Sequence, residues 1–164
     1  MQTAARDAGV RARQSGHNGC VRSWETGQDG VVTLPGGRLV RGRALRAGAL
    51  TPDLTPDFGV YFTSRPHAER WESRWIAWPD FGLPREPSEL LAALHDAYER
   101  APRMRVEVAC DGGTGRTGTA IAILARYAGV AAEDAVAWTR ANYRPGAIET
   151  PGQRRFARRT TLAT

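Results

Sequence analysis

One segment in the second half of the chain constrains the fold more than any other. A strand-like run over 105–109 (RVEVA) leads into a glycine-rich turn over 110–116, and the apolar residues that follow predict a helix over 117–128. The apolar character on both sides of the turn indicates that strand and helix are both buried. A buried strand followed directly by a buried helix is typical of a sheet covered by helices. An α/β domain is therefore expected.

The rest of the chain supplies further elements for this domain. The predicted class is α/β, with a short central, mostly parallel sheet flanked by helices. Ser88 can cap the first predicted helix, and the prolines within 81–87 predict a loop before it. The expected strands are 31–34, 38–40, 59–63 and 74–78, and the other expected helices are 88–101, 132–142 and one beginning at Thr150.

The length and the first residues bear on domain organisation. A chain of 164 residues has the size of one domain. Residues 1–28 carry almost no periodic apolar pattern, so we expect a flexible N-terminal segment there and a single domain over 29–164. The first sixteen residues contain charges and no apolar stretch, and no run approaches a membrane span. A cytoplasmic location is expected.

Composition excludes several functions. All 23 basic residues are arginine, so a Walker P-loop, a protein kinase and a pyridoxal enzyme, each of which needs a lysine, are ruled out. Cys20, Cys110 and three scattered histidines offer no zinc-ligand spacing, and neither a metal nor a cofactor is expected. The net charge of +6 favours anionic partners. No aromatic-interleaved or helix-turn-helix pattern supports nucleic acid as that partner.

The glycine-rich turn can bind an anion. Several backbone N–H groups and the positive end of a helix dipole converge there, which attracts a phosphate. The same groups stabilise an ionised sulfur at Cys110, and Arg116 adds planar, bidentate donors for phosphoryl oxygens. Two other interpretations remain open at this point. Gly113, Gly115 and Gly118 spell a dinucleotide fingerprint, although no acidic strand end follows, and Cys110 could simply be a buried packing residue.

A second motif supplies an acid. Asp80 lies in Trp78-Pro79-Asp80-Phe81-Gly82, at the head of the proline-rich loop and about thirty residues before Cys110. A leaving alkoxide or phenoxide needs a proton, and a carboxylic acid can give it. The chain therefore contains a nucleophile, an anion clamp and a proton donor.

Together these two motifs resemble those of the protein tyrosine phosphatases. Residues 110–117 are similar to the C-x5-R-[S/T] signature, and 78–82 are similar to the mobile general-acid loop of that superfamily. The close match covers about fifteen residues and suggests a compact bacterial tyrosine or dual-specificity-like enzyme. It implies hydrolysis of phosphate monoesters, most of all protein phosphotyrosine, in the domain 29–164. A phosphorylated protein or peptide would be the partner.

The resemblance also implies residue roles. Cys110 would form a phosphocysteine, Asp80 would act as general acid and then base, and Thr117 would assist departure of the thiolate. Gln153 resembles a water-orienting glutamine, although Thr150-x-x-Gln153 also fits a helix capping box. The residues expected to bind phosphate are Asp111, Gly112, Gly113, Thr114, Gly115 and Arg116.

The sequence departs from the family pattern at two points. Ala109 stands where the family usually has histidine, and no counterpart of its Asn-Arg-Tyr element is found. A weak or inactive phosphotyrosine-binding pseudophosphatase is therefore the alternative.

The loop interior 111–115 adds no cation, which disfavours polyphosphorylated inositol head groups. Arginine clusters at 38–46 and 154–159 are interpreted as solvated faces or guides for an acidic phosphopeptide, and Cys20 could serve as a resolving thiol.

Overall fold

The computed structural model describes residues 21–164. They form a five-stranded sheet with the order β1-β2-β5-β3-β4. Only β1 and β2 pair in antiparallel fashion, and the three other pairings are parallel. The strands are β1 (Val31–Thr33), β2 (Leu39–Ala44), β3 (Phe58–Thr63), β4 (Glu72–Ala77) and β5 (Val106–Cys110). The prediction of a short, mostly parallel sheet is confirmed.

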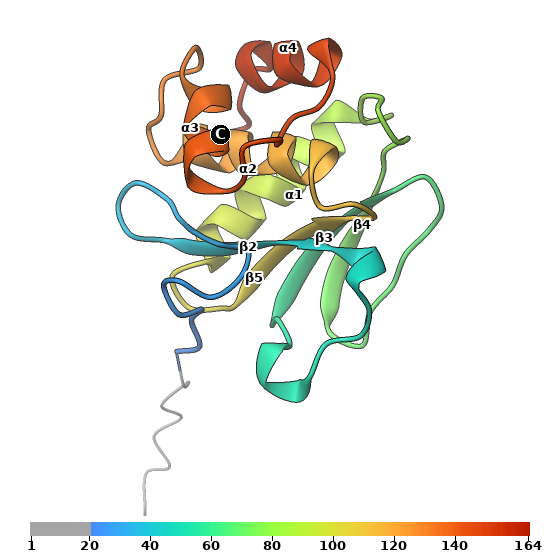
Figure 1. The fold of residues 1–164 in the computed structure, drawn as a ribbon, viewed down its shortest axis with the longest axis vertical. Helices are drawn as coiled ribbons and strands as arrows, with labels where there is room; N and C mark the ends of the chain where they lie inside the picture. The colour runs from blue at the N-terminus through green and yellow to red at the C-terminus, as the bar shows by residue number, and fades with distance from the viewer. Residues whose placement is uncertain (1–20) are drawn as a thin grey trace, which may run out of the picture.

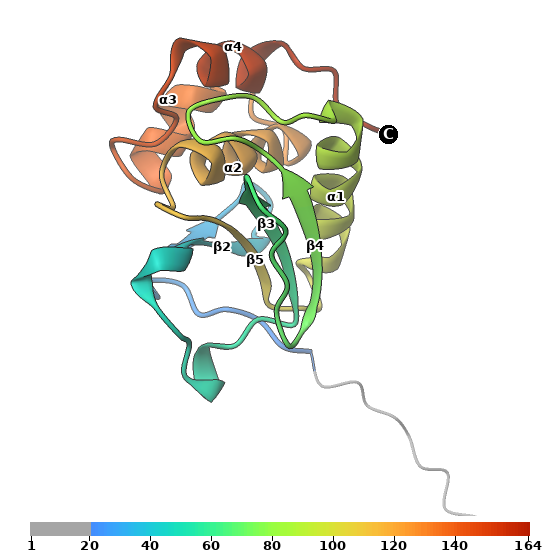
Figure 2. The same cartoon turned by 90° about the vertical axis from the view of Figure 1, so that its right-hand side faces the viewer.

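Four α-helices lie on the same side of this sheet (Figures 1 and 2). Of these, α1 and α2 contact the strands directly, while α3 and α4 pack on α2. The main core lies between the sheet and the first two helices, and it includes Val60, Phe62, Leu90, Val106, Val108 and Ile121. The helices are α1 (Pro87–Arg100), α2 (Gly115–Tyr127), α3 (Ala135–Asn142) and α4 (Pro151–Arg159).

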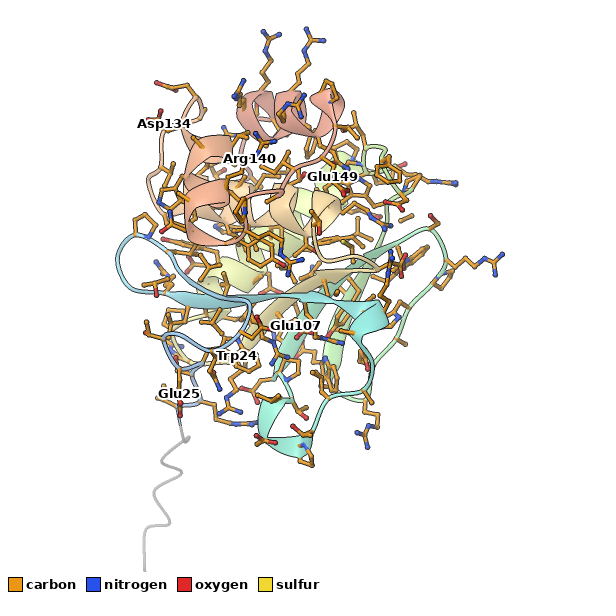
Figure 3. The ribbon with its side chains drawn as sticks, viewed as in Figure 1. Trp24, Glu25, Glu107, Asp134, Arg140 and Glu149 are labelled. Atoms are coloured by element: carbon orange, nitrogen blue, oxygen red, sulfur yellow. The ribbon has the colours of Figure 1, made fainter. Side chains whose placement is uncertain are left out.

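The opposite face of the sheet carries a buried polar network. Glu107 of β5 is fully buried and accepts hydrogen bonds from Arg41, Arg43 and Tyr61. A buried carboxylate needs such partners to offset its loss of hydration. Trp24 lies on the same face (Figure 3), where its indole N–H donates to the carbonyl of Val106 at 2.7 Å. Trp24 is 2% exposed, so packing begins before the expected boundary at residue 29.

Helix starts were the least accurate predictions. Ser88 does not cap α1: the N-cap is Glu86 and the helix begins at Pro87, because proline suits the first helical position, where no N–H is needed. The third helix begins at Ala135 rather than at residue 132, since 132–134 form a turn. The cap of α4 is confirmed, with Thr150 and Gln153 forming a complete capping box.

Candidate active site

Three loops meet at one edge of the sheet because parallel strands end at the same edge. The loop after β5 is the glycine-rich turn. The segment after β4 begins with Trp78 and carries Asp80, and the short 3-10 helix η1 (Leu45–Ala47) follows β2. The register pairs Ala44 with Cys110, which brings η1 beside the start of the glycine-rich turn. Residues far apart in the sequence therefore gather around one sulfur.

The glycine-rich turn leaves its backbone amides available for an anion. Helix α2 begins inside the turn at Gly115, and its N-cap Thr114 makes no side-chain capping bond. The first N–H groups of a helix have no partner within the helix, so they can bind a ligand. Gly113 has a φ of 65°, and a Cβ there would lie 2.8 Å from the backbone nitrogen of Ala44. Only glycine fits this tight corner.

Three carbonyl groups of the turn accept hydrogen bonds, two of them from residues outside the turn. The carbonyl of Asp111 accepts from the backbone N–H of Arg46 at 3.2 Å. The carbonyl of Gly112 accepts from the Thr114 hydroxyl at 3.2 Å, and that of Gly113 accepts from the Tyr143 hydroxyl at 2.6 Å. Since C=O and N–H point in opposite directions across a planar trans peptide, each bond turns the next amide toward the inside of the turn.

Cys110 ends β5 at the base of this turn. Cys110 is 2% exposed and is a free cysteine. The hydroxyl of Thr117, in the first turn of α2, donates to the sulfur at 3.0 Å. Cys110 and Thr117, which the sequence predicted as a pair, are therefore in direct contact. A donated hydrogen bond of this kind stabilises a thiolate.

Arg116 connects the glycine-rich turn to the acid loop. It is 2% exposed, and its Nη1 donates to the carbonyl of Trp78 at 3.0 Å. Its Nη2 lies 3.3 Å from the Asp80 carboxylate and 3.4 Å from that of Asp111. Among the atoms of residues 21–164, its Nε is buried without a hydrogen-bond partner. Arg116 therefore joins the two loops while one of its donors is without a partner among these residues.

The acid loop is anchored by Trp78. This side chain is fully buried, and its indole N–H donates to the carbonyl of Gly82 at 2.8 Å. The bond closes 78–82 into a tight loop, within which Phe81 has a φ of 58° and is 62% exposed. The Asp80 side chain is half exposed beside Arg116. Asp80 is thus placed at the mouth of the site.

Gln153 has structural contacts on both sides. Its Oε1 accepts from the backbone N–H groups of Glu149 and Thr150 at 3.1 and 3.3 Å, which completes the cap of α4. Its Nε2 donates to the carbonyl of Gly82 at 3.4 Å. Gln153 is fully buried. It therefore joins α4 to the acid loop.

These groups surround a pocket of about 280 Å³. Sequence reasoning missed three of its lining residues as members of the site: Arg46, Phe81 and Glu149. Figure 3 shows Glu149 on the helical side, near the start of α2. No local signal in the sequence places Arg46 here, because its position depends on the pairing of β2 with β5. The pocket is lined by Arg46, Asp80, Phe81, Cys110, Gly112, Thr114, Gly115, Arg116 and Glu149.

The arginine cluster at 38–46 does not form one solvated face, since Arg46 is exposed but Arg38, Arg41 and Arg43 are not. Arg41 and Arg43 bind the buried Glu107, Arg38 contacts the Tyr98 hydroxyl, and Arg46 reaches the pocket. On α4, Arg155, Arg158 and Arg159 are exposed, as interpreted from the sequence. Cys20 lies outside the described residues.

The described part of the chain contains neither a group of metal-binding side chains nor a helix that could span a membrane. Within residues 21–164, no three His, Cys, Asp or Glu side chains are grouped so that they could hold a metal ion. None of the helices in that same range is long and apolar enough to cross a membrane.

Comparison with known proteins defines the class and then the family. The solved structure titled "Crystal structure of Tk-PTP in the active form" matches with a TM-score of 0.57 and 25% sequence identity, covering 74% of this chain and 90% of that one. The model of the protein-tyrosine phosphatase family matches residues 57–163, which include the acid loop and the glycine-rich turn. The chain belongs to the protein-tyrosine phosphatase family, and it is a phosphatase, a hydrolase of phosphate esters.

Proposed function

We propose that this phosphatase hydrolyses protein phosphotyrosine through a phosphocysteine at Cys110. The observation that supports this most is the position of Arg116, which contacts Asp80 and Trp78 of the acid loop and Asp111 of the glycine-rich turn. A guanidinium in that position can bind two phosphoryl oxygens while it keeps the proton donor beside the leaving oxygen. Catalysis is assigned to the single domain 29–164.

In the first step, the Cys110 sulfur attacks phosphorus. The S–P bond forms as the bond between phosphorus and the leaving oxygen breaks, and Asp80 donates its proton to that oxygen. The amides of 111–116 and the Arg116 guanidinium bind the three remaining phosphoryl oxygens, on which the charge is spread.

In the second step, water attacks the phosphocysteine. Asp80, now ionised, accepts the proton of this water as the O–P bond forms and the S–P bond breaks. Inorganic phosphate leaves and the thiolate returns, stabilised by the Thr117 hydroxyl at 3.0 Å. We assign the orientation of the attacking water to Gln153, whose amide nitrogen already points to the acid loop.

Two features of the pocket rim favour an aryl phosphate on a peptide. Phe81 lines the pocket and is largely exposed, so its ring is available to pack against a phenyl ring. Arg46 forms no ion pair with any residue in the described range and lies in the same pocket, where it can attract an acidic neighbour of the phosphotyrosine. The carboxylates of Asp111 and Glu149 disfavour head groups with several phosphates.

A panel of substrates tests this assignment. We expect the protein to release phosphate from a phosphotyrosine peptide about tenfold faster than from the matching phosphoserine peptide, because the aryl ring adds contacts at the rim worth about 1.4 kcal/mol. The measurement is kcat/KM by free-phosphate detection, with a phosphoinositide as a third arm. Stoichiometric binding of the peptide without release would instead assign the protein to the pseudophosphatases, and equal rates for both peptides would remove the preference for tyrosine.

Asp80→Asn tests the acid. We expect about a 10²–10⁴-fold loss in kcat/KM with phenyl phosphate, whose leaving group needs a proton, and a much smaller loss with an activated nitrophenyl ester. The matched control is Asp111→Asn, because the Asp111 carboxylate lies at nearly the same distance from Arg116 and is similarly exposed. This control should affect both esters equally. Equal losses for the two esters in Asp80→Asn would remove the acid role.

A further inference from the structure

The carbonyl of Gly113 is held by a residue that neither sequence motif contains. Tyr143 is the C-cap of α3, and its hydroxyl donates to this carbonyl at 2.6 Å. Its ring lies against Gly42 of β2, where a Cβ would come within 2.6 Å of the ring carbons. Glycine at 42 therefore leaves the slot that lets the tyrosine reach the turn. Ala109, directly before Cys110, has a side chain that can form no hydrogen bond to the turn.

The direction of this hydrogen bond is fixed by its chemistry. A backbone carbonyl can only accept, so the Tyr143 hydroxyl must donate. Burial raises the pKa of Tyr143 well above the ordinary value for tyrosine, and the hydroxyl keeps its proton across the working pH range. Tyr143 is thus a permanent donor to the turn.

The bond has a consequence on the other side of the peptide. The Gly113 carbonyl and the Thr114 N–H belong to one planar unit and point in opposite directions. With the carbonyl held by Tyr143, the Thr114 N–H faces the inside of the turn. Gly112 and Gly113 are adjacent glycines, whose backbone samples more conformations than that of any other residue. Without the tyrosine, this peptide is free to rotate and present its oxygen to an anion.

We propose that Tyr143 is the positioning residue that presets the Thr114 amide for the phosphoryl group. This role rests on the proposed function of the same site, and it adds a residue that touches neither substrate nor sulfur. Tyr143 thereby supplies, from α3, a support for the turn that Ala109 does not give. Its contribution is pre-organisation, which removes the need to order the turn when the anion binds.

Tyr143→Phe is the variant of choice, because it keeps the ring against Gly42 and removes only the donor. We expect tungstate, a phosphate-like oxyanion, to bind about tenfold more weakly by calorimetry, the size of effect given by one hydrogen bond near the upper end of the usual range. In turnover of an aryl phosphate we expect kcat/KM to fall by about the same factor. Tungstate binding as tight as in the wild type would overturn the proposal.

A second tyrosine provides the matched control. Tyr127 ends α2 and its hydroxyl contacts the carbonyl of Leu91 and the N–H of Ala163. It is separated from Gly115 by the length of α2, roughly 18 Å. Tyr127→Phe should lower the melting temperature and leave tungstate affinity unchanged. An equal loss of affinity in both variants would show a general effect of stability and would overturn the positioning role.

A measurement on the unmodified chain covers the case in which Tyr143→Phe does not fold. In ¹⁵N NMR spectra, tungstate should shift the amide signal of Thr114 along with those of Gly112 and Gly113. An unmoved Thr114 signal would contradict the proposal. Failure of the proposed function is distinguishable, because tungstate binding and its loss in Tyr143→Phe need no turnover. A protein that binds tungstate through Thr114 and releases no phosphate would keep the positioning role and lose the catalytic one.

Discussion

Replacing Cys110 by serine is expected to lower the turnover of an aryl phosphate by about 10⁵-fold or more, the scale seen when an enzyme loses its nucleophile. The Cys110 sulfur lies at the base of the glycine-rich turn and accepts a hydrogen bond from the Thr117 hydroxyl. These groups stabilise a thiolate, whereas a serine hydroxyl in the same place stays protonated and has no base within the proposed mechanism to activate it. The measurement is kcat/KM with a nitrophenyl phosphate.

The chain offers a matched control for this prediction. Cys20→Ser changes the only other cysteine in the sequence and should keep full activity. Cys110→Ser should still bind a phosphotyrosine peptide, since the amides of the turn and Arg116 are unchanged. Adding a chelator to the wild type should leave the rate unaltered, because Arg116 and the amides supply the positive charge in the proposed mechanism. Wild-type activity in Cys110→Ser would refute the role of this sulfur.

Arg116→Lys is expected to cost about 10³–10⁵ in kcat/KM, in line with the loss of a guanidinium that binds a transferring phosphoryl group. The arginine reaches Trp78 with one nitrogen and faces Asp80 and Asp111 with another. A lysine ammonium is a single point of charge on a flexible stem. It cannot hold the acid loop and two phosphoryl oxygens at once.

Arg126→Lys is the control for this substitution. Arg126 lies on the same helix and donates to the carbonyl of Ala157 at 2.9 Å, away from the pocket. It should keep activity within about twofold, because a single hydrogen bond to a carbonyl is one that lysine can replace. Melting curves of both variants check that the fold is intact. An Arg116→Lys enzyme that retains more than about a tenth of wild-type kcat/KM would contradict the clamp.

The strand, turn and helix around Cys110 could be predicted because their signals are local. The strand-like run over 105–109 and the apolar helix after it lie next to each other in the sequence, and burial of their apolar residues follows from this pattern. The cap at Thr150 could be predicted for the same reason, since its two partners are three residues apart. The order of strands and helices then indicated a parallel sheet.

Contacts across the sheet could not be read from the sequence. Arg46 reaches the pocket only because β2 runs parallel to β5 with Ala44 beside Cys110. Tyr143 reaches Gly113 because Gly42 leaves room for its ring. Trp24 looked like part of a loose lead-in, yet it lies on the polar face of the sheet and donates to the carbonyl of Val106. Such pairings depend on register, and no periodic pattern reports register between distant segments.

The most direct measurement traps the covalent intermediate. Asp80→Asn enzyme is mixed with nitrophenyl phosphate, whose activated leaving group departs without an acid, while the second step lacks its base and slows. Quenching within the first turnover and mapping the peptides by mass spectrometry should find one phosphoryl group on Cys110, and none in a Cys110→Ser variant. A first-turnover sample with nitrophenol released and Cys110 unmodified, or with the phosphoryl group on another residue, would contradict the account.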